Sequence, residues 1–393
     1  MPSTPQATQF SLTRRQWIYA AASMVLSRGR MWPMGSAMQP EIVFAGTYTG
    51  TGSQGIYAYR WSAATGELDP LGLAAATENP SYLVVSADRK LLYSVNEMAP
   101  QPGQETGRVS AFRRTHEPGR LAHLNTVPSG GTEPCNLAID TAGKNLFAAN
   151  YGSGSFSRFP LLPDGSLQPA AQNLYFHGHS VNPDRQTSPH THCTTLSPGG
   201  RYLLVNDLGL DRIYVYHLDP KTATLTANAV PFYSAIPGSG PRNLKFHPNA
   251  RWAYSANEMG SSIDVLHWLE QSGELHRVQN LSTLPAGYSQ PNTAATVYVH
   301  PNGKYVYASN RGHNSVATFA VDPKQGTLTL RAHISCGGKT PRFFTMDPAG
   351  NWLLVANQDS QNIVILRCDA ATGLLTETGR QYTLDHPVCL AFA

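Results

Sequence analysis

The pattern of apolar and polar residues along the chain repeats about every fifty residues. Each copy has an apolar run, usually led by proline, then a short polar turn and an aromatic-rich run that ends on an asparagine, as in PRNLKFHPNARWAYSANE at 241–258. The closing residues of the six copies are Asn96, Asn150, Asn206, Asn257, Asn310 and Asn357, at intervals of 54, 56, 51, 53 and 47 residues. A period of this length is typical of folds that use one β-sheet per repeat.

A second pair of apolar runs follows each copy, as in DRIYVYHLDPKTATLTA at 211–227 and NSVATFAVDPKQGTLTL at 314–330. Seven such pairs occur along the chain. Within a pair, apolar and polar residues alternate, and a turn that contains glycine or proline separates the halves, which is the pattern of an antiparallel hairpin. The two pairs together predict a four-stranded antiparallel sheet for each repeat.

The two ends of the chain supply the missing strands of a seventh sheet. Residues 41–48 (EIVFAGTY) resemble a second strand without its first, and residues 386–392 (HPVCLAF) resemble a first strand without its second. Pairing of these segments closes the ring and removes two exposed sheet edges. We therefore predict an all-β fold, a seven-bladed β-propeller of four-stranded antiparallel blades, closed by the N- and C-terminal strands.

The composition agrees with this prediction and excludes several other classes of protein. Among 393 residues there are 34 Gly, 29 Pro and 18 Tyr, with 14% charged residues, which is unlike a coiled coil or a disordered chain. A net charge of +4 without a basic run argues against a nucleic-acid partner. Five widely spaced cysteines indicate neither a disulfide framework nor a zinc site.

The first 38 residues have the pattern of an export signal. Arg14 and Arg15 precede an uncharged, mildly apolar stretch at 17–26 and small residues up to Ala37, as in twin-arginine signals. The apolar stretch is too short to span a bilayer. We expect a leader and linker at 1–38 and a single propeller domain at 39–393, in the periplasm or outside the cell; without a working leader, the protein is expected in the cytoplasm.

Strand direction predicts which end of the propeller carries the chemistry. In an up-and-down blade, the start of strand one and the end of strand two lie on the same face, opposite the short and uniform hairpin turns. The loops on that face vary in length, and variable loops on a rigid scaffold often carry function. Aligning the repeats gives a first ring at the start of strand one: Ser81, Cys135, His192, Arg242, Ala295, Arg342 and Val388. A second ring follows the repeat asparagine: Tyr48, Glu97, Tyr151, Asp207, Glu258, Arg311 and Gln358.

Charged side chains in positions that ought to be equivalent break the repeat pattern and indicate a site. We predict His192, Arg242, Glu258 and Arg311 as the catalytic group. The two arginines offer planar donor forks for an anion or oxyanion, and Glu258 and His192 are candidates for proton transfer. We expect His190, Glu97, Asp207, Arg342 and Gln358 to contact substrate.

Two other interpretations of these residues stay open. The charges could form a salt-bridge network between blades, since buried charges are generally paired. Asp207 and Asp211 flank Gly209 and could form a turn instead of binding substrate. His177, His179, His190 and His192 share one long loop at 173–193, but no carboxylates stand at matching spacing, so we expect neither a metal nor another cofactor. No nucleotide-binding or nucleophile-elbow motif is present in the sequence.

Four stretches resemble the seven-bladed propeller lactonases, which include 6-phosphogluconolactonase and carboxy-cis,cis-muconate cyclase. They are DRQTSPHTHCTTLSPGGRYLLVNDLGLDRIYVY at 184–216, GSGPRNLKFHPNARWAYSANE at 238–258, SNRGHNS at 309–315, and GGKTPRFFTMDPAGNWLLVANQDSQNI at 337–363. The resemblance implies a His, Arg, Glu, Arg site, matched here by His192, Arg242, Glu258 and Arg311. Phe343 departs from the family pattern, in which a histidine often follows Pro-Arg.

The resemblance implies metal-independent hydrolysis of an anionic sugar lactone by a protein expected to be monomeric. An export signal conflicts with a phosphorylated cytosolic substrate, so either the substrate is another lactone or the leader is not a signal. The alternatives are a muconate-type lactone cyclase, which is an isomerase, and a non-catalytic binding propeller of the envelope.

Overall fold

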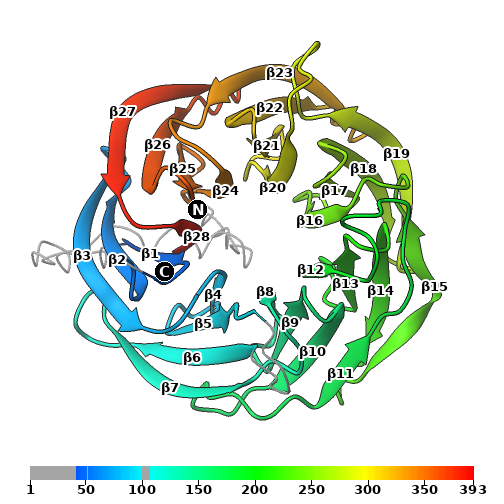
Figure 1. The fold of residues 1–393 in the computed structure, drawn as a ribbon, viewed down its shortest axis with the longest axis horizontal. Helices are drawn as coiled ribbons and strands as arrows, with labels where there is room; N and C mark the ends of the chain where they lie inside the picture. Colours follow the sequence, from blue (N-terminus) through cyan, green and yellow to red (C-terminus); the bar gives the residue numbers. More distant parts are fainter. Residues whose placement is uncertain (1–40, 51, 100–106) are drawn as a thin grey trace, which may run out of the picture. The chain divides into compact units, whose positions relative to one another are not determined.

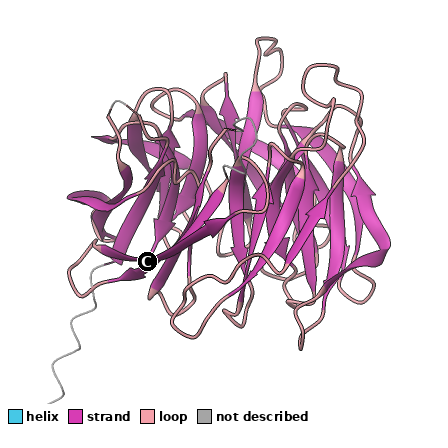
Figure 2. Cartoon of the chain, turned by 60° about the horizontal axis from the view of Figure 1, so that its bottom comes forward, coloured by secondary structure: helices cyan, strands magenta, loops and turns pink. Residues whose placement is uncertain are grey.

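The computed structural model describes residues 41–50, 52–99 and 107–393. The predicted leader at 1–38 lies outside these residues. All regular elements in the described part are β-strands, which form seven four-stranded sheets arranged as blades of a ring (Figure 1). Neighbouring strands within every blade are antiparallel, and Figure 2 shows only strands and loops in this part of the chain. The described residues contain no helix, and so none that could cross a membrane. The seven-bladed prediction is confirmed.

The blade that closes the ring combines the two ends of the chain. Its strand order is β28-β1-β2-β3, with β28 nearest the centre of the ring (Figure 1). Val43 pairs with Phe392 and Ala45 with Leu390, as the ring-closure prediction requires. Its strands are β1 (Glu41–Thr47), β2 (Gly55–Ser62), β3 (Glu67–Ala76) and β28 (Pro387–Phe392).

The other six blades each use four consecutive strands, and each blade is named below by its innermost strand. The β4 blade has β4 (Leu83–Val85), β5 (Leu91–Asn96), β6 (Arg108–Arg114) and β7 (Leu121–Pro128). The β8 blade has β8 (Pro134–Ile139), β9 (Asn145–Asn150), β10 (Ser155–Pro160) and β11 (Gln172–Tyr175). The β12 blade has β12 (Thr191–Leu196), β13 (Tyr202–Asp207), β14 (Arg212–Leu218) and β15 (Leu225–Ser234).

The remaining three blades complete the ring. The β16 blade has β16 (Pro241–Phe246), β17 (Trp252–Asn257), β18 (Ser262–Leu269) and β19 (Glu274–Ser282). The β20 blade has β20 (Thr293–Val299), β21 (Tyr305–Arg311), β22 (Ser315–Val321) and β23 (Leu328–Ser335). The β24 blade has β24 (Pro341–Met346), β25 (Trp352–Asn357), β26 (Asn362–Cys368) and β27 (Leu375–Thr383).

The core lies between the faces of neighbouring blades. Second strands such as β17 and β25 are buried along their whole length, because other blades cover both of their faces. Outer strands such as β27 alternate mainly between partly buried and exposed residues, which is the pattern of a strand that faces solvent on one side. At the closing blade, the ring of Trp61 packs edge-on against Trp352 at 6.3 Å and Phe392 at 5.7 Å. Ring closure is therefore supported by side-chain packing as well as by strand pairing.

In several blades, the repeat asparagine bonds to the link that enters the blade. The side-chain amide of Asn310 donates to the carbonyl of Thr283 at 2.8 Å, and that of Asn357 donates to Cys336 at 2.9 Å. Both carbonyls belong to links between the outer strand of one blade and the inner strand of the next. Such a bond satisfies a backbone group in a segment that has no ladder partner, which explains why the residue recurs.

Candidate active site at one mouth of the channel

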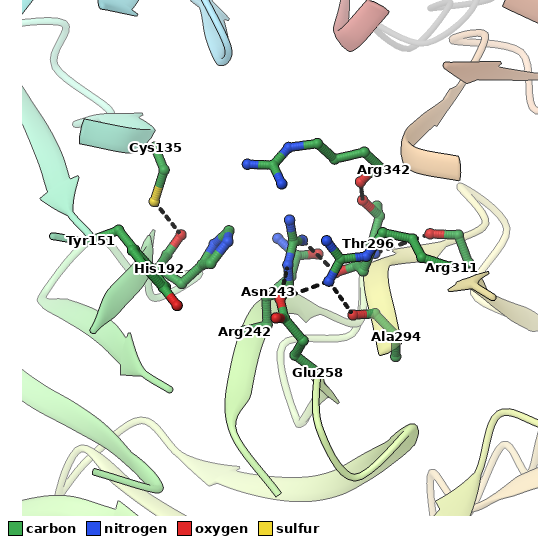
Figure 3. Close-up of polar contacts among 12 residues, drawn as sticks. Cys135, Tyr151, His192, Arg242, Asn243, Glu258, Ala294, Thr296, Arg311 and Arg342 are labelled. Carbon is green, nitrogen blue, oxygen red and sulfur yellow. Dashed lines mark hydrogen bonds and ion pairs between the residues drawn. The ribbon is translucent and has the colours of Figure 1, made fainter. Parts of the chain in front are cut away.

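A β-bulge turns the side chain of most first-ring residues into the channel. The pairing of first and second strands shifts by one residue at Cys135, His192, Arg242 and Arg342, so each of these four residues lacks a cross-strand partner. A bulge bends the strand and re-aims the extra residue's side chain. Figure 3 shows His192, Arg242 and Arg342 extending toward a common space. The repeat therefore delivers these side chains to one end of the channel, as predicted.

Second-ring residues are fixed by a recurring backbone hydrogen bond. The N–H of Glu258 donates to Gly240 at 2.7 Å, and that of Tyr151 donates to Glu133 at 2.9 Å. In each case the acceptor stands two residues before the bulge. The same bond is made by Tyr48, Glu97 and Gln358. Both rings therefore belong to one rigid backbone motif, which limits the movement of the side chains at this mouth.

Asp207 is an exception, because the predicted alignment is wrong by one residue in the β12 blade. Asn206 pairs with Ile213 there as Ala256 pairs with Ile263 in the β16 blade, so Asp207 occupies the position of the repeat asparagine. Its carboxylate accepts the backbone N–H groups of His190 at 2.9 Å and Leu210 at 3.0 Å. Leu208 therefore occupies the position equivalent to Glu258.

Two connected cavities occupy this mouth. The outer one, here called the mouth cavity, has a volume of about 290 Å³. It is lined by Tyr48, Glu97, Glu133, Cys135, Tyr151, Arg185, His192, Glu258, Thr293, Arg311 and Arg342. An inner cavity of about 20 Å³, large enough for one water molecule, is lined by Ser81, Tyr82, Cys135, Asn136, His192, Arg242, Asn243, Thr296, Arg342, Phe343 and Val388. Cys135, His192 and Arg342 line both, so the two spaces adjoin at these three residues.

The Glu258 carboxylate forms ion pairs with three arginines. Nε of Arg242 and Nη2 of Arg311 contact one oxygen, and Nη2 of Arg185 contacts the other, each at 2.8 Å. Burial alone would raise the pKa of Glu258, but the charges of Arg311 and Arg242 outweigh it and hold that pKa well below its ordinary value. Glu258 is therefore ionised at neutral pH and orients the guanidinium groups around it.

The contact between Arg185 and Glu258 was not predicted from the sequence. The guanidinium of Arg185 also donates to the Tyr151 hydroxyl at 3.2 Å, and its side chain is 42% exposed. A long loop that belongs to no repeat carries Arg185, so alignment of repeats could not place it. The one available signal was that loop's unusual length.

Arg342 and Glu97 form the second charged group of the mouth. Tyr48 donates its hydroxyl to Glu97 at 2.8 Å, and Ser81 donates to the other carboxylate oxygen. Nη2 of Arg342 lies 3.6 Å from Glu97, and its guanidinium lies over the Tyr48 ring at 5.3 Å. No other described residue accepts a hydrogen bond from this guanidinium, which leaves its donors available to an anion in the cavity.

His192 is neutral at pH 7 and lies beside the arginines. Burial lowers the pKa of its imidazole well below 6.5, and the charge of Arg242 lowers it further. The ring is in edge contact with Tyr151 at 5.7 Å. His190 stacks on the other side of Tyr151 at 4.5 Å, and its Nδ1 lies 3.1 Å from the Tyr151 carbonyl. His190 therefore supports Tyr151 and does not line either cavity.

The structure brings together most of the predicted site residues. His192, Glu258, Arg311, Glu97 and Arg342 line the mouth cavity, and Arg242 lines the inner one. The side chains of His190, Asp207 and Gln358 line neither cavity. Among the side chains that the structure describes, no three His, Cys, Asp or Glu residues are close enough together to hold a metal ion.

The chain is similar to proteins named as lactonases. The description "Lactonase, 7-bladed beta-propeller" matches residues 42–392. A 6-phosphogluconolactonase of Bacillus subtilis is 33% identical over 90% of this chain and 99% of its own length.

Two solved structures share this fold. One is a Bacteroides fragilis protein provisionally named a 6-phosphogluconolactonase, with 39% identity and a TM-score of 0.85 over 91% of this chain and 99% of that one. The other is a periplasmic gluconolactonase of Pseudomonas aeruginosa, with 34% identity and a TM-score of 0.84 over 90% of this chain and 99% of that one. On this evidence, the chain belongs to the seven-bladed β-propeller lactonase family.

Proposed function

We propose that the protein hydrolyses a sugar lactone, in the manner of a 6-phosphogluconolactonase, at the mouth that contains Arg242 and Arg342. The observation that carries the proposal is a pair of guanidinium groups with unused donors beside a neutral imidazole: that of Arg242 is buried and that of Arg342 is partly buried. Arg242 uses Nε on Glu258 and Nη1 on the Ala295 carbonyl at 2.7 Å, which leaves Nη2 free for a ligand. Family membership supports the same reaction.

Lactone hydrolysis places negative charge on the carbonyl oxygen when water attacks the carbonyl carbon. Preorganised donors in a site with little water stabilise that charge strongly. Arg242 and Arg342 are suited to this role, since both guanidinium groups are directed into the channel (Figure 3). Arg311 lines the mouth cavity and not the inner one, and its contact with Glu258 at 2.8 Å makes it a support for Arg242 through that carboxylate.

Within this proposal, Glu258 orients arginines and carries no proton. A general acid or base works best when its pKa is close to the working pH, whereas the arginines hold the pKa of Glu258 far lower. The neutral ring of His192 lines the mouth cavity and can accept a hydrogen bond from the attacking water there. Glu258 therefore has a different role from the proton transfer for which the sequence made it a candidate, and His192 positions the water.

We propose further that the protein acts outside the cytoplasm, on a sugar lactone that is present there. The twin-arginine pattern around Arg14 and Arg15 supports export. A solved relative at 34% identity is named a periplasmic gluconolactonase. A phosphorylated sugar lactone is not expected in that compartment, so we rank unphosphorylated aldonolactones first as substrates.

The test is a pH-stat assay of the purified protein with gluconolactone, galactonolactone and 6-phosphogluconolactone, after subtraction of spontaneous hydrolysis. We expect saturable, enzyme-dependent acid release with at least one of the three compounds and no loss of activity in the presence of a chelator. A folded protein that accelerates none of these reactions would contradict the proposal and favour the binding propeller.

A further inference from the structure

One carboxylate in the mouth cavity is not engaged by any of its arginines. Glu133 belongs to the link between β7 and β8 and lines the mouth cavity. Its side chain is half-buried, and no hydrogen bond or ion pair joins it to another residue in the described part of the chain. The other two acids in the cavity are engaged, since Glu258 contacts three arginines and Glu97 accepts two hydroxyl groups. Glu133 is thus the one acid of the three that is available to a ligand.

The backbone holds Glu133 in an unusual conformation. Its φ is 51°, in the left-handed region that non-glycine residues seldom adopt. Two hydrogen bonds keep it there, because its N–H donates to Met98 at 3.2 Å and its carbonyl accepts from Tyr151 at 2.9 Å. The equivalent residues of other blades share this conformation, since φ is 41° at Asn79, 65° at Gly240 and 58° at Thr340. The conformation therefore belongs to the repeated backbone motif, and in this blade it fixes the position from which the Glu133 side chain extends.

A glycine leaves space for the carboxylate. A Cβ atom placed on Gly152 would lie 2.6 Å from Oε2 of Glu133, closer than side chains tolerate. Gly152 directly follows Tyr151, the second-ring residue of the same blade. The absence of a side chain at Gly152 therefore leaves room for the Glu133 carboxylate at the edge of the β8 blade.

Glu133 lies across the ring from the cationic group. It belongs to the β8 blade, whereas Arg242, Arg311 and Arg342 belong to the consecutive β16, β20 and β24 blades. Glu97, in the adjacent β4 blade, lies 3.6 Å from Arg342 and belongs to the charged group described above. A lactone that fills the mouth cavity with its carbonyl oxygen toward the arginines would have the attacking water on the side of Glu133.

We propose that Glu133 is a catalytic residue, the group that transfers the proton during lactone hydrolysis; this rests on the proposed function. The carboxylate takes a proton from water as the water oxygen bonds to the carbonyl carbon. The protonated Glu133 then gives that proton to the ring oxygen as the bond between the carbonyl carbon and the ring oxygen breaks. One lactone and one water give one hydroxy acid, and Glu133 returns to its starting state.

The electrostatic setting agrees with this role. Burial raises the pKa of Glu133 above its ordinary value of 4.5, and the charge of Glu97 raises it further. The other titratable and charged groups around the same cavity are Tyr48, Glu97, Cys135, Tyr151, Arg185, His192, Glu258, Arg311 and Arg342. The arginines hold the pKa of Glu258 well below its ordinary value and burial lowers the pKa of His192, whereas the pKa of Glu133 is raised. A pH profile can therefore distinguish Glu133 from His192 once either is replaced.

The test compares Glu133→Gln with the wild type on the best lactone of the pH-stat panel. We expect kcat to fall by about 100-fold or more, as for loss of a general acid or base, with KM changed less than threefold. The acidic limb of the kcat/KM profile should disappear, because it reports the deprotonation of Glu133. Glu377→Gln, at an exposed position on β27, is the matched control and should retain wild-type kcat.

A second variant guards against a folding defect. Gly152→Ala leaves every charge in place but puts a methyl group against Oε2 of Glu133, so it should lower kcat without removing the acidic limb. If the wild type hydrolyses lactones while Glu133→Gln keeps its kcat and acidic limb, the assignment of Glu133 is wrong. If the wild type itself hydrolyses none, the proposed function fails instead. A variant with reduced stability but unchanged kcat per folded molecule would make Glu133 a structural residue and overturn the proposal.

Discussion

Glu258→Gln separates the structural and catalytic roles of the buried charges. The substitution keeps the shape of the side chain but removes the charge that three guanidinium groups contact at 2.8 Å. The side chains of Glu258 and Arg242 are both 6% exposed, and that of Arg311 is 14% exposed. Breaking a buried ion pair costs about 3 to 5 kcal/mol, because the partner charge stays buried. The contact with Arg185 adds little, since Arg185 is 42% exposed and solvent screens it.

The pH dependence of this loss has a definite sign. The folded pKa of Glu258 is lower than its unfolded pKa, because Arg311 and Arg242 outweigh the effect of burial. Its stabilising contribution is therefore complete above the unfolded value, about 4.3, and is lost as the pH falls through the lower folded value. Thermal melts at pH 7 should show Glu258→Gln unfolding several degrees below the wild type. The difference between the two proteins should shrink in strong acid.

Activity measurements on the same variant complete the test. We expect KM to rise, because Arg242 loses the contact that orients its guanidinium, while the acidic limb of the pH profile stays in place. Glu117→Gln is a suitable control, since its ion pair with Arg120 is exposed and worth about 1 kcal/mol or less. A Glu258→Gln protein with wild-type melting temperature, a 100-fold lower kcat and no acidic limb would refute this reasoning and make Glu258 the proton carrier.

Two further predictions concern the ends of the chain. Deletion of residues 388–393 removes the innermost strand of the closing blade and exposes the edge of β1, so the truncated protein should aggregate or melt well below the wild type; an unchanged melting temperature would contradict closure of the ring by β28. Replacing Arg14 and Arg15 by lysine should keep the precursor in the cytoplasm of a host with a twin-arginine system, as fractionation and immunoblotting can determine. Continued processing to a shorter mature protein would contradict the export prediction.

The fold could be predicted from the sequence because the residue pattern that specifies a blade is repeated along the chain. The alternation of apolar and polar residues recurs in every blade, and the incomplete units at 41–48 and 386–392 could only complement each other. The same periodicity located the first ring, including His192, Arg242 and Arg342. The bulges that turn these side chains inward were not predicted, because no residue type in the repeat signals them.

The errors and omissions at the site have local causes. Asp207 was misplaced because asparagine and aspartate stand next to each other at 206 and 207, and only the alignment of Tyr202 with Trp252 distinguishes them. Arg185 lies on a loop that has no counterpart in the repeat, so its position depends on tertiary contacts. Glu133 occupies a repeated position, two residues before the bulge, but the residue type at this position differs from blade to blade, as Asn79, Gly240 and Thr340 show. The charge state of Glu258 depends on how many arginines reach it, and sequence spacing does not reveal that number.

The most direct test of the site is the ratio of kcat/KM between the wild type and Arg242→Ala, with each value divided by the folded fraction. Arg242 offers its remaining donor to the developing oxyanion, so its loss should cost about 2 to 4 kcal/mol of transition-state stabilisation, or about 30-fold to 1,000-fold in kcat/KM. Glu258 keeps Arg311 and Arg185 as partners in this variant, so most of the protein should remain folded. A kcat/KM within threefold of the wild type would contradict the assignment of lactone hydrolysis to this mouth of the propeller.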